Sequence, residues 1–257
     1  MGETLPGGSR RVNLHSAIRR FASSERALVV ADFDGTLAPI VDHPDEAELE
    51  ARSAEALVRL ATLPGVEPVI LSGRGYADLT ERVGDLPGVT LIGGHGSEAD
   101  GSATPDDLTE VRARFDRSVA RLPGAWIETK HHSLGLHYRA VTSSDLEDEL
   151  EDLRRWAKSH AVHLMENKRI FEAGVRPLSK GVAVAELRTA VGGGAVFYAG
   201  DDATDETVFV TLEPGDIGVK VGDGPTAAAF RVEDIDAVAG VLEDLLAAFG
   251  DAGVHPS

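Results

Sequence analysis

Residues 27–41, ALVVADFDGTLAPIV, join a short apolar run to a pair of acidic residues. The small and β-branched residues at 27–31 are typical of a strand that is buried on both faces of a parallel sheet. Asp32 and Asp34 follow, one residue apart, and precede Gly35. A D-x-D pair alone is a weak signal, because turn caps and solvated loop acids also produce it. Its function depends on what the rest of the chain places beside it.

The composition of the 257 residues indicates a globular protein. The apolar fraction of 42% is too high for a disordered chain, and no apolar run approaches the ~20 residues that span a bilayer. The first 21 residues carry arginines but no apolar signal-peptide region. The absence of cysteine excludes thiol catalysis and thiolate metal sites. We therefore expect a soluble, cytoplasmic protein.

The net charge of −18 limits the classes of partner. Nucleic acids and anionic membranes are disfavoured, because binding them requires clustered Lys and Arg. An anionic small molecule stays possible if the fold builds a local basic pocket. Nothing in the sequence indicates an obligate protein partner.

Short apolar runs alternate with helical patterns in both terminal parts of the chain. The runs are rich in Val and Ile, end at Gly, Asp or Ser, and lie at residues 27–33, 66–71, 89–93, 195–199 and 216–221. Helices are expected at 44–62, 180–191, 225–230 and 232–249, the first with Ala47, Ala51, Ala54, Val58 and Ala61 spaced as one apolar side. This alternation predicts a doubly wound α/β domain, which binds ligands beyond the carboxyl ends of its parallel strands.

The middle of the chain has a different pattern. Helices are expected at 105–122 and 144–160, and strands at 125–130, 134–140, 162–165 and 169–173. The first two strands predict an antiparallel hairpin, with Trp126 and Trp156 in the core of the segment. We therefore expect a leader (1–24), a core domain (25–99 and 175–250), an inserted α+β cap domain (100–174) and a tail (251–257).

Three further polar groups follow other expected strands or begin a helix. They are Ser72-Gly73-Arg74, Ser179-Lys180, and Asp201 with Asp202 and Asp205. The acids would repel one another unless a hard cation such as Mg²⁺ lay among them. A hydroxyl, a lysine and the backbone at Gly35 suit a phosphoryl group. The combination predicts phosphoryl transfer with a carboxylate nucleophile.

These motifs resemble those of a known family. In chain order, DFDGTL, LSGR, SKG and GDDATDE resemble the four motifs of the haloacid dehalogenase superfamily of phosphohydrolases. DFDGTLAPIV, GDDATDETVF, VKVGDGPTAAAFRVEDIDAV, ETK…LHYR and FEAGVRPLSKG are similar to its trehalose-6-phosphate phosphatase branch. The resemblance runs from about Leu14 to Phe249, and the loop with His95 and Gly96 is its more variable part.

The resemblance implies a Mg²⁺-dependent phosphatase that hydrolyses trehalose 6-phosphate through an aspartyl-phosphate. Asp32 would be the nucleophile, and Asp34 would protonate the leaving sugar oxygen and then deprotonate water. Mg²⁺ would be held by Asp32, the backbone carbonyl of Asp34, and Asp201, with Asp205 acting as a further ligand through water or as a partner of the ligating residues. The phosphoryl group would contact Gly35, Ser72, Gly73, Arg74 and Lys180.

In the cap, the resemblance implies that Glu128, Lys130, Arg139 and Glu172 contact the sugar or orient the phosphate. Plain solvent exposure of one face of the hairpin is the alternative for these charges. Two other functions stay open: a relative that acts on another sugar phosphate, such as a glycosyl-phosphoglycerate, and a decayed, non-catalytic module. The intact catalytic motifs disfavour the second.

Overall fold

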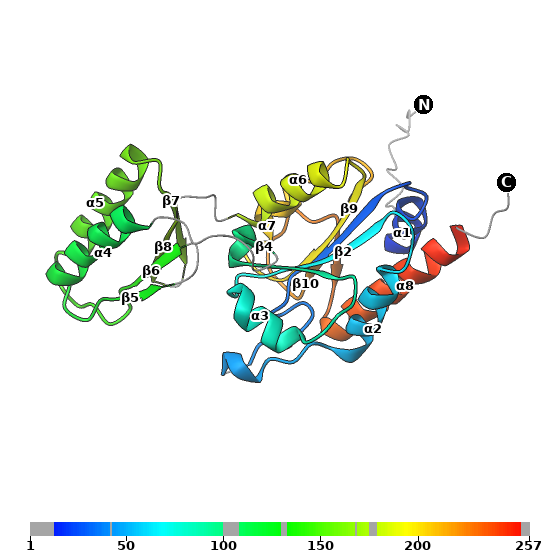
Figure 1. Ribbon diagram of the computed structural model, residues 1–257, viewed down its shortest axis with the longest axis horizontal. Coiled ribbons are helices and arrows are strands. Elements are labelled where there is room, and N and C mark those ends of the chain that lie inside the picture. The colour runs from blue at the N-terminus through cyan, green and yellow to red at the C-terminus, as the bar shows by residue number, and fades with distance from the viewer. Residues whose placement is uncertain are drawn as a thin grey trace, which may run out of the picture.

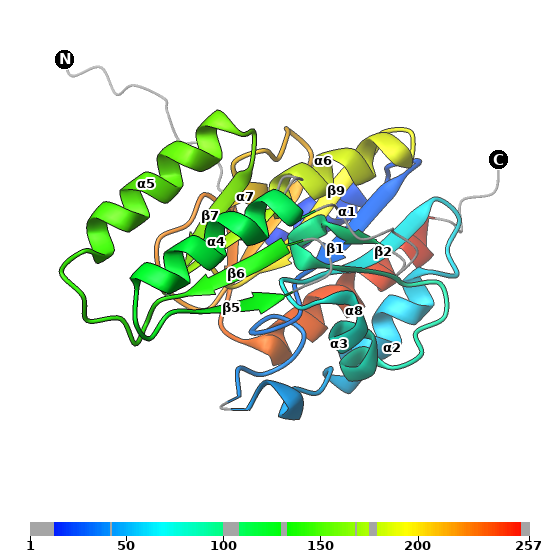
Figure 2. The same cartoon turned by 60° about the vertical axis from the view of Figure 1, so that its left-hand side comes forward.

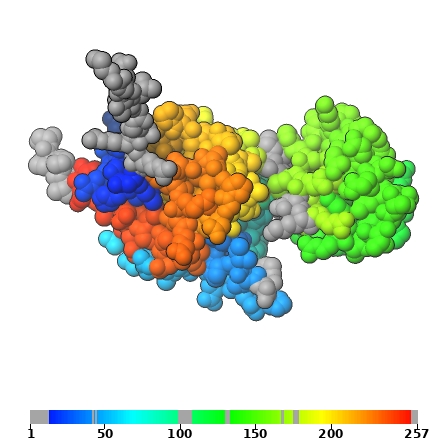
Figure 3. All heavy atoms as spheres, turned by 180° about the vertical axis from the view of Figure 1, so that it is seen from behind, coloured from blue at the N-terminus to red at the C-terminus, as the bar shows by residue number. Residues whose placement is uncertain are grey.

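Two β-sheets organise the chain (Figure 1). A seven-stranded sheet, here the core sheet, takes its strands from both ends of the sequence, and a four-stranded sheet, the cap sheet, takes its strands from the middle. The computed structural model describes residues 13–41, 43–99, 108–129, 133–167, 169–174 and 179–252. The space-filling view shows the green middle segment as a separate lobe beside the rest of the chain (Figure 3).

The core sheet is parallel except at one edge. Its strands run in the order β11 (Phe230–Val232), β10 (Ile217–Val221), β9 (Ala195–Gly200), β1 (Ala27–Ala31), β2 (Val66–Leu71), β3 (Thr90–Gly93) and β4 (Glu98–Ala99). Only β4 pairs antiparallel, with β3. From β1 the chain adds β2 and β3 on one side and β9 and β10 on the other, so β1 lies at the switch point where such sheets bind ligands.

Helices cover both faces of the core sheet (Figures 1 and 2). Val29 and Ala31 pack on one face, and Leu28 and Val30 on the other, as the two-residue period of a strand requires. The first face is covered by α1 (Leu14–Phe21), α2 (Ala51–Leu60), α3 (Tyr76–Val83) and α8 (Ile235–Ala252), and the second by α6 (Lys180–Ala190) and α7 (Glu206–Phe209).

The helix expected at 44–62 is shorter than predicted. Only a 3₁₀ turn, η1 (Pro44–Glu46), forms at its start, and α2 begins at Ala51 because the Glu50 carboxylate accepts hydrogen bonds from the N–H groups of Arg52 (3.0 Å) and Ser53 (2.7 Å). The buried positions of α2 are Ser53, Ala56, Leu57 and Leu60, rather than the expected alanine stripe. Leucine buries more apolar area than alanine, so its side of the helix packs inward.

The prediction of a helix at 225–230 is wrong. Phe230 begins β11, which pairs in parallel with β10, and the Arg231 guanidinium donates to the carbonyl oxygens of Gly222 and Gly224. The backbone N–H of Ala227 donates to the Glu206 carboxylate (2.8 Å). Pairing at the edge of the sheet overrides the helix propensity of the alanine run.

The cap sheet is antiparallel and carries both cap helices on one face. Its order is β5 (Trp126–Thr129), β6 (Ser133–His137), β8 (Ile170–Gly174) and β7 (His163–Asn167), with α4 (Thr109–Arg121) and α5 (Leu146–Ser159) packed on Leu134, Leu136 and Phe171. The predicted hairpin is β5–β6. The opposite face, here the open face, carries Trp126, Glu128, Gly135, His137 and Glu172 by strand alternation and register.

Figure 1 shows the helices α4 and α5 on the side of the cap sheet that lies away from the core sheet, so the open face is turned toward the core. The two sheets together confirm the expected fold class, an α/β domain with a separate α+β part. The domain boundaries stay a prediction. Within the described ranges, no helix combines the length and the apolar character that crossing a membrane requires.

Candidate active site

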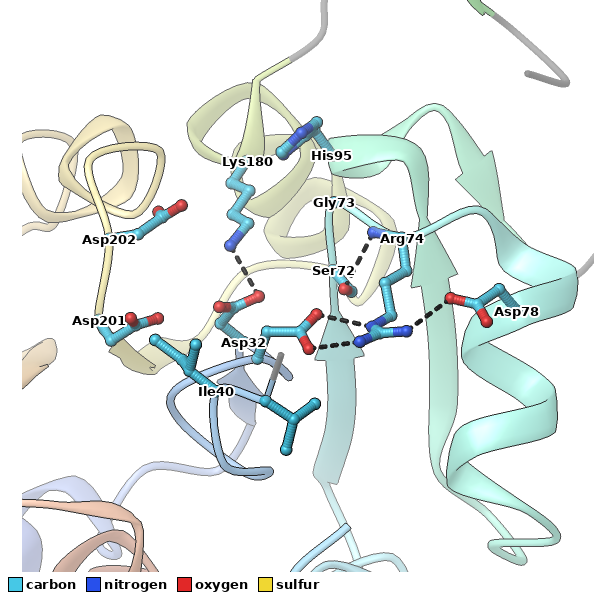
Figure 4. A pocket seen from close by; sticks show the side chains of 12 residues that line it. Asp32, Ile40, Ser72, Gly73, Arg74, Asp78, His95, Lys180, Asp201 and Asp202 are labelled. Atoms are coloured by element: carbon cyan, nitrogen blue, oxygen red, sulfur yellow. Dashed lines mark hydrogen bonds and ion pairs between the residues drawn. The ribbon is translucent and has the colours of Figure 1, made fainter. Parts of the chain in front are cut away.

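A pocket of about 430 Å³ opens at the carboxyl ends of β1, β2 and β9 (Figure 4). It is lined by Asp32, Asp34, Ile40, Val41, Ser72, Gly73, Arg74, Asp78, His95, Lys180, Asp201 and Asp202. Residues from all four sequence motifs are therefore assembled at one edge of the core sheet, as the parallel topology requires.

Lys180, which lines this pocket, lies between two buried carboxylates. The Nζ of Lys180 is 2.7 Å from Oδ1 of Asp32 and 2.8 Å from Oδ1 of Asp205. Burial raises the pKa of Asp32 well above its usual value, although Lys180 acts in the opposite direction. Burial would lower the pKa of Lys180, but the charges of Asp32 and Asp205 raise it above its usual value. The ammonium group therefore stays charged beside the first strand.

Asp205 is fixed by three donors, one of which the sequence reasoning missed. The Tyr198 hydroxyl donates to Oδ1 of Asp205 (2.6 Å), which also accepts from Lys180, and the N–H of Asp202 donates to Oδ2 (2.9 Å). Tyr198 is fully buried in β9. A hydroxyl-bearing residue inside an otherwise apolar strand just before the acidic motif is the signal that could have identified it. Because both oxygens are engaged, Asp205 is better placed to hold Lys180 than to bind a cation alone.

The acidic residues of the pocket fit a hard cation. Asp32, Asp201 and Asp205 each offer a carboxylate oxygen within 4.8 Å of the others. Among the described residues, Oδ1 of Asp201 is buried and has no hydrogen-bond partner. Burial, followed by the charges of Asp205 and Asp202, raises the pKa of Asp201 to about 6. A buried carboxylate oxygen that lacks a donor is a suitable ligand for Mg²⁺.

The backbone around this cluster requires glycine at one position. Gly35 has a φ of +84°, and a Cβ there would lie 2.4 Å from the Asp201 carboxylate. Lys220, which the sequence reasoning also missed, is buried on β10 and donates to the backbone carbonyl of Asp201. The position of Asp201 is therefore set by a close backbone approach on one side and a buried ammonium group on the other.

The Asp34 carboxylate is held by an arginine. Nε and Nη2 of Arg74 donate to its two oxygens at 2.7 and 2.6 Å, and Nη1 of Arg74 donates to Asp78 at 2.8 Å (Figure 4). The guanidinium also lies over the Phe33 ring. In this arrangement Arg74 binds carboxylates, so its expected contact with a phosphoryl group stays a prediction. The expected metal contact of Asp34, through its backbone carbonyl, stays a prediction too.

The loop after β2 packs against the loop that contains His95. The Ser72 carbonyl accepts a hydrogen bond from the N–H of His95 (2.9 Å), and a Cβ on Gly73 would lie 2.5 Å from the His95 ring. A Cβ on Gly96 would lie 2.3 Å from the Cβ of Ala183 on α6. This loop, the more variable part of the resemblance, therefore fits between the Ser72 loop and α6.

Two of the expected cap residues, Glu128 and Glu172, lie on the open face. Glu128 and Glu172 both stand opposite Gly135, on its two neighbouring strands. Oε2 of Glu128 is 2.9 Å from Nε2 of His137. The Ser133 hydroxyl donates to the buried carboxylate of Glu172 at 2.6 Å.

The other two expected cap residues, Arg139 and Lys130, are not placed on the open face by the structure. Arg139 is exposed in the turn after β6, which ends at His137, although the strand was expected to run to 140. Lys130 lies outside the described residues. The expectation for Trp126 is wrong: this residue is 53% exposed, because it lies on the open face rather than on the helix-covered face. Trp156 packs against the cap core as expected.

Comparisons with known proteins agree with this geometry. The trehalose-phosphatase family model matches residues 30–235. The chain is 30% identical over 238 residues to a bifunctional trehalose-6-phosphate synthase/phosphatase of Thermoproteus tenax, which covers 88% of this chain and 32% of that protein. It is 34% identical over 232 residues to a trehalose-phosphate phosphatase of Mycobacterium avium, which covers 80% of this chain and 58% of that protein.

The structure is also similar to a solved one. The trehalose-6-phosphate phosphatase of Aspergillus fumigatus superposes with a TM-score of 0.78 at 27% identity, covering 92% of this chain and 98% of that one. The chain spans about a third of the Thermoproteus protein and 58% of the Mycobacterium protein. The resemblance found in the sequence motifs is confirmed, and this chain belongs to the trehalose-phosphatase family.

Proposed function

We propose that this chain is a Mg²⁺-dependent phosphatase that converts trehalose 6-phosphate and water to trehalose and inorganic phosphate. The observation that carries the proposal is the buried Asp32 carboxylate, held by Lys180 at the switch point of the sheet. Family membership and the names of the relatives support the substrate.

Asp32 is the proposed nucleophile. Lys180 holds its Oδ1, which leaves Oδ2 to attack phosphorus while the bond from phosphorus to the sugar oxygen breaks. Lys180 and the Ser72 hydroxyl lie beside the same pocket and would bind the phosphoryl oxygens. Water then hydrolyses the aspartyl-phosphate and regenerates the carboxylate.

The residues that would hold Mg²⁺ are Asp32 and Asp201, with the Asp34 carbonyl and Asp205 close by. When bound, the ion supplies positive charge that offsets the carboxylates and the phosphoryl oxygens. Burial, followed by the neighbouring charges of Asp205 and Asp202, raises the pKa of Asp201.

Asp34 is the proposed acid and base. It would give a proton to the leaving sugar oxygen and later take one from the attacking water. Both carboxylate oxygens of Asp34 accept hydrogen bonds from Arg74, so the pair occupies the atoms that would carry the proton. We infer that this pair must open before Asp34 donates a proton, and that Arg74 is a positioning residue for it.

The test is phosphate release from a panel of phosphomonoesters, with Mg²⁺ and with EDTA. Trehalose 6-phosphate should be the best substrate, glucose 6-phosphate a poor one because it lacks the second ring, and EDTA should abolish turnover until Mg²⁺ is restored. Ca²⁺ should substitute poorly, because it favours more ligands at longer distances. Full activity in EDTA would remove the metal from the mechanism. A better rate with a glycosyl-phosphoglycerate or another sugar phosphate would assign that substrate instead.

A further inference from the structure

We propose that Trp126 is a specificity-determining residue whose indole stacks on the pyranose ring of the substrate that carries no phosphate. The inference rests on the proposed function, because it supposes a disaccharide phosphate. It concerns a position outside the motifs that carry the family resemblance.

The first observation is where the exposed aromatic surface lies. Trp126 is 53% exposed and is the sole aromatic residue among the large apolar side chains found exposed in the described part of the chain. Its register partner on β6 is His137, and Glu128 is two residues further along the same strand face. The indole therefore belongs to the open face, which is turned toward the core (Figure 1).

The second observation is that the indole is held in place. Its ring is stacked on the His137 imidazole, with the centroids 3.8 Å apart and the planes 12° apart. Glu128 fixes that imidazole through its contact with Nε2. One side of the indole is thus covered, and its large exposed fraction leaves the other side for a ligand. A platform that is already rigid loses little conformational entropy when a ligand binds.

The third observation is the chemistry beside the platform. Gly135 has no side chain, and the carboxylates of Glu128 and Glu172 stand on either side of it. A pyranose ring offers an apolar face of C–H groups and a rim of hydroxyl donors, which match an aromatic ring next to carboxylates. The carboxylates would repel a phosphate group, and the phosphate is bound by Lys180 in the core. The unphosphorylated ring is therefore the part that this face suits.

The experiment uses the two tryptophans of the chain. Trp156 stacks on His160 on the helix side of the cap, so Trp156→Phe leaves Trp126 as the single tryptophan, which can be excited selectively at wavelengths that tyrosine does not absorb. In that variant, titration with trehalose should change the indole emission in a saturable way, and inorganic phosphate with Mg²⁺ should not. An emission that does not respond to trehalose would overturn the proposal.

Kinetics provide the second measurement. Trp126→Ala should lower kcat/KM for trehalose 6-phosphate by on the order of 10–100-fold, mainly through KM, while Trp126→Phe, which keeps a flat apolar ring, should stay within about threefold of wild type. The loss on p-nitrophenyl phosphate should be at least about tenfold smaller. Trp156→Phe is the control and should match wild type on both substrates.

Equal losses on the two substrates would overturn the proposal, because they would indicate that Trp126 contacts the core when the cap closes, for instance at the exposed Ile40. Failure of the proposed function gives a different result: wild-type enzyme would then not hydrolyse trehalose 6-phosphate. The trehalose titration needs no turnover and still tests the platform in that case.

Discussion

The core pocket and the open face of the cap hold their polar groups in different ways. In the pocket, Lys180 and Asp205 are 2% and 0% exposed and are locked by short hydrogen bonds. On the open face, the Glu128 side chain is 42% exposed and Trp126 is half exposed, although Glu172 is buried beside Ser133. The difference suggests a division of labour. Buried, preorganised charges suit the reaction at phosphorus, whereas an accessible face is completed only by a substrate large enough to reach it.

The largest expected effect is at the nucleophile. Asp32→Asn should lower turnover by about 10⁴-fold or more on trehalose 6-phosphate and on p-nitrophenyl phosphate alike, because the amide cannot form the aspartyl-phosphate. Single-turnover phosphate release measures this, and the variant should also fail to bind beryllium fluoride in the presence of Mg²⁺. A folded Asp32→Asn protein with wild-type turnover would remove the covalent mechanism and with it the chemical role of the pocket.

Asp34→Asn should have a smaller effect that depends on the leaving group. We expect a loss of on the order of 10²–10⁴-fold on trehalose 6-phosphate, the usual contribution of general acid–base catalysis. The loss should shrink on p-nitrophenyl phosphate, whose leaving group scarcely needs a proton. The rates on the two substrates, measured in parallel, test whether Asp34 transfers the proton. An equal loss on both would assign Asp34 to structure or metal binding.

Substitutions on the open face should affect the hydrolysis of trehalose 6-phosphate more than the chemical step in the core pocket. Glu128→Ala and Glu172→Ala should each lower kcat/KM for trehalose 6-phosphate by roughly 10–10²-fold, because sugar hydroxyls then lack acceptors. Hydrolysis of p-nitrophenyl phosphate should suffer far less. Glu147→Ala, at an exposed acid in the first turn of α5, is the matched control. If the open-face variants slow both substrates equally, the comparison with the core pocket fails.

The smallest expected effect is on stability. The pKa of Asp201 is raised to about 6 by burial in the folded chain, so the folded state binds its proton more tightly than the unfolded state. The metal-free protein should therefore lose stability as pH rises from about 4 to about 6, with the loss complete above that range. Mg²⁺ binding offsets the loss, so Mg²⁺ should raise Tm by several degrees at pH 7.5 and by less at pH 5.

Melting curves with Mg²⁺ and with EDTA at the two pH values check this expectation. Asp201→Asn is the informative variant, because it removes both the charge and a proposed ligand oxygen. A gain in Tm that is the same at both pH values, or that survives in Asp201→Asn, would contradict the role assigned to this carboxylate.

The sequence predicted the core strands well, and the reason is local. Each is a short apolar run, most of them largely buried, and parallel pairing then brings Asp32, Ser72 and Asp201 to one edge of the sheet. The start of α2 and the strand at Phe230 were missed, because a capping carboxylate and an edge pairing decide them. Both depend on partners that hydrophobic periodicity does not show.

The side-chain partners inside the site were harder to anticipate. The sequence motifs place Arg74 near a phosphate, but not in a fork with Asp34. Trp126 follows an apolar pattern that suits either face of a half-buried strand, so composition alone assigned it to the wrong face. Tyr198 was overlooked because it reads as one more apolar position of β9. The Arg74–Asp34 pair joins residues 40 positions apart, which no local pattern in the sequence shows.

The short connection between β8 and α6 limits the distance between these two elements. β8 ends at Gly174 and α6 begins at Lys180, and six peptide steps reach at most about 20 Å. The strand that carries Glu172 therefore cannot lie farther than this from the helix that begins with Lys180. A chimaera that takes its middle segment from a relative should keep the length of this connection. Each added residue would increase the greatest possible distance between the strand with Glu172 and the helix with Lys180.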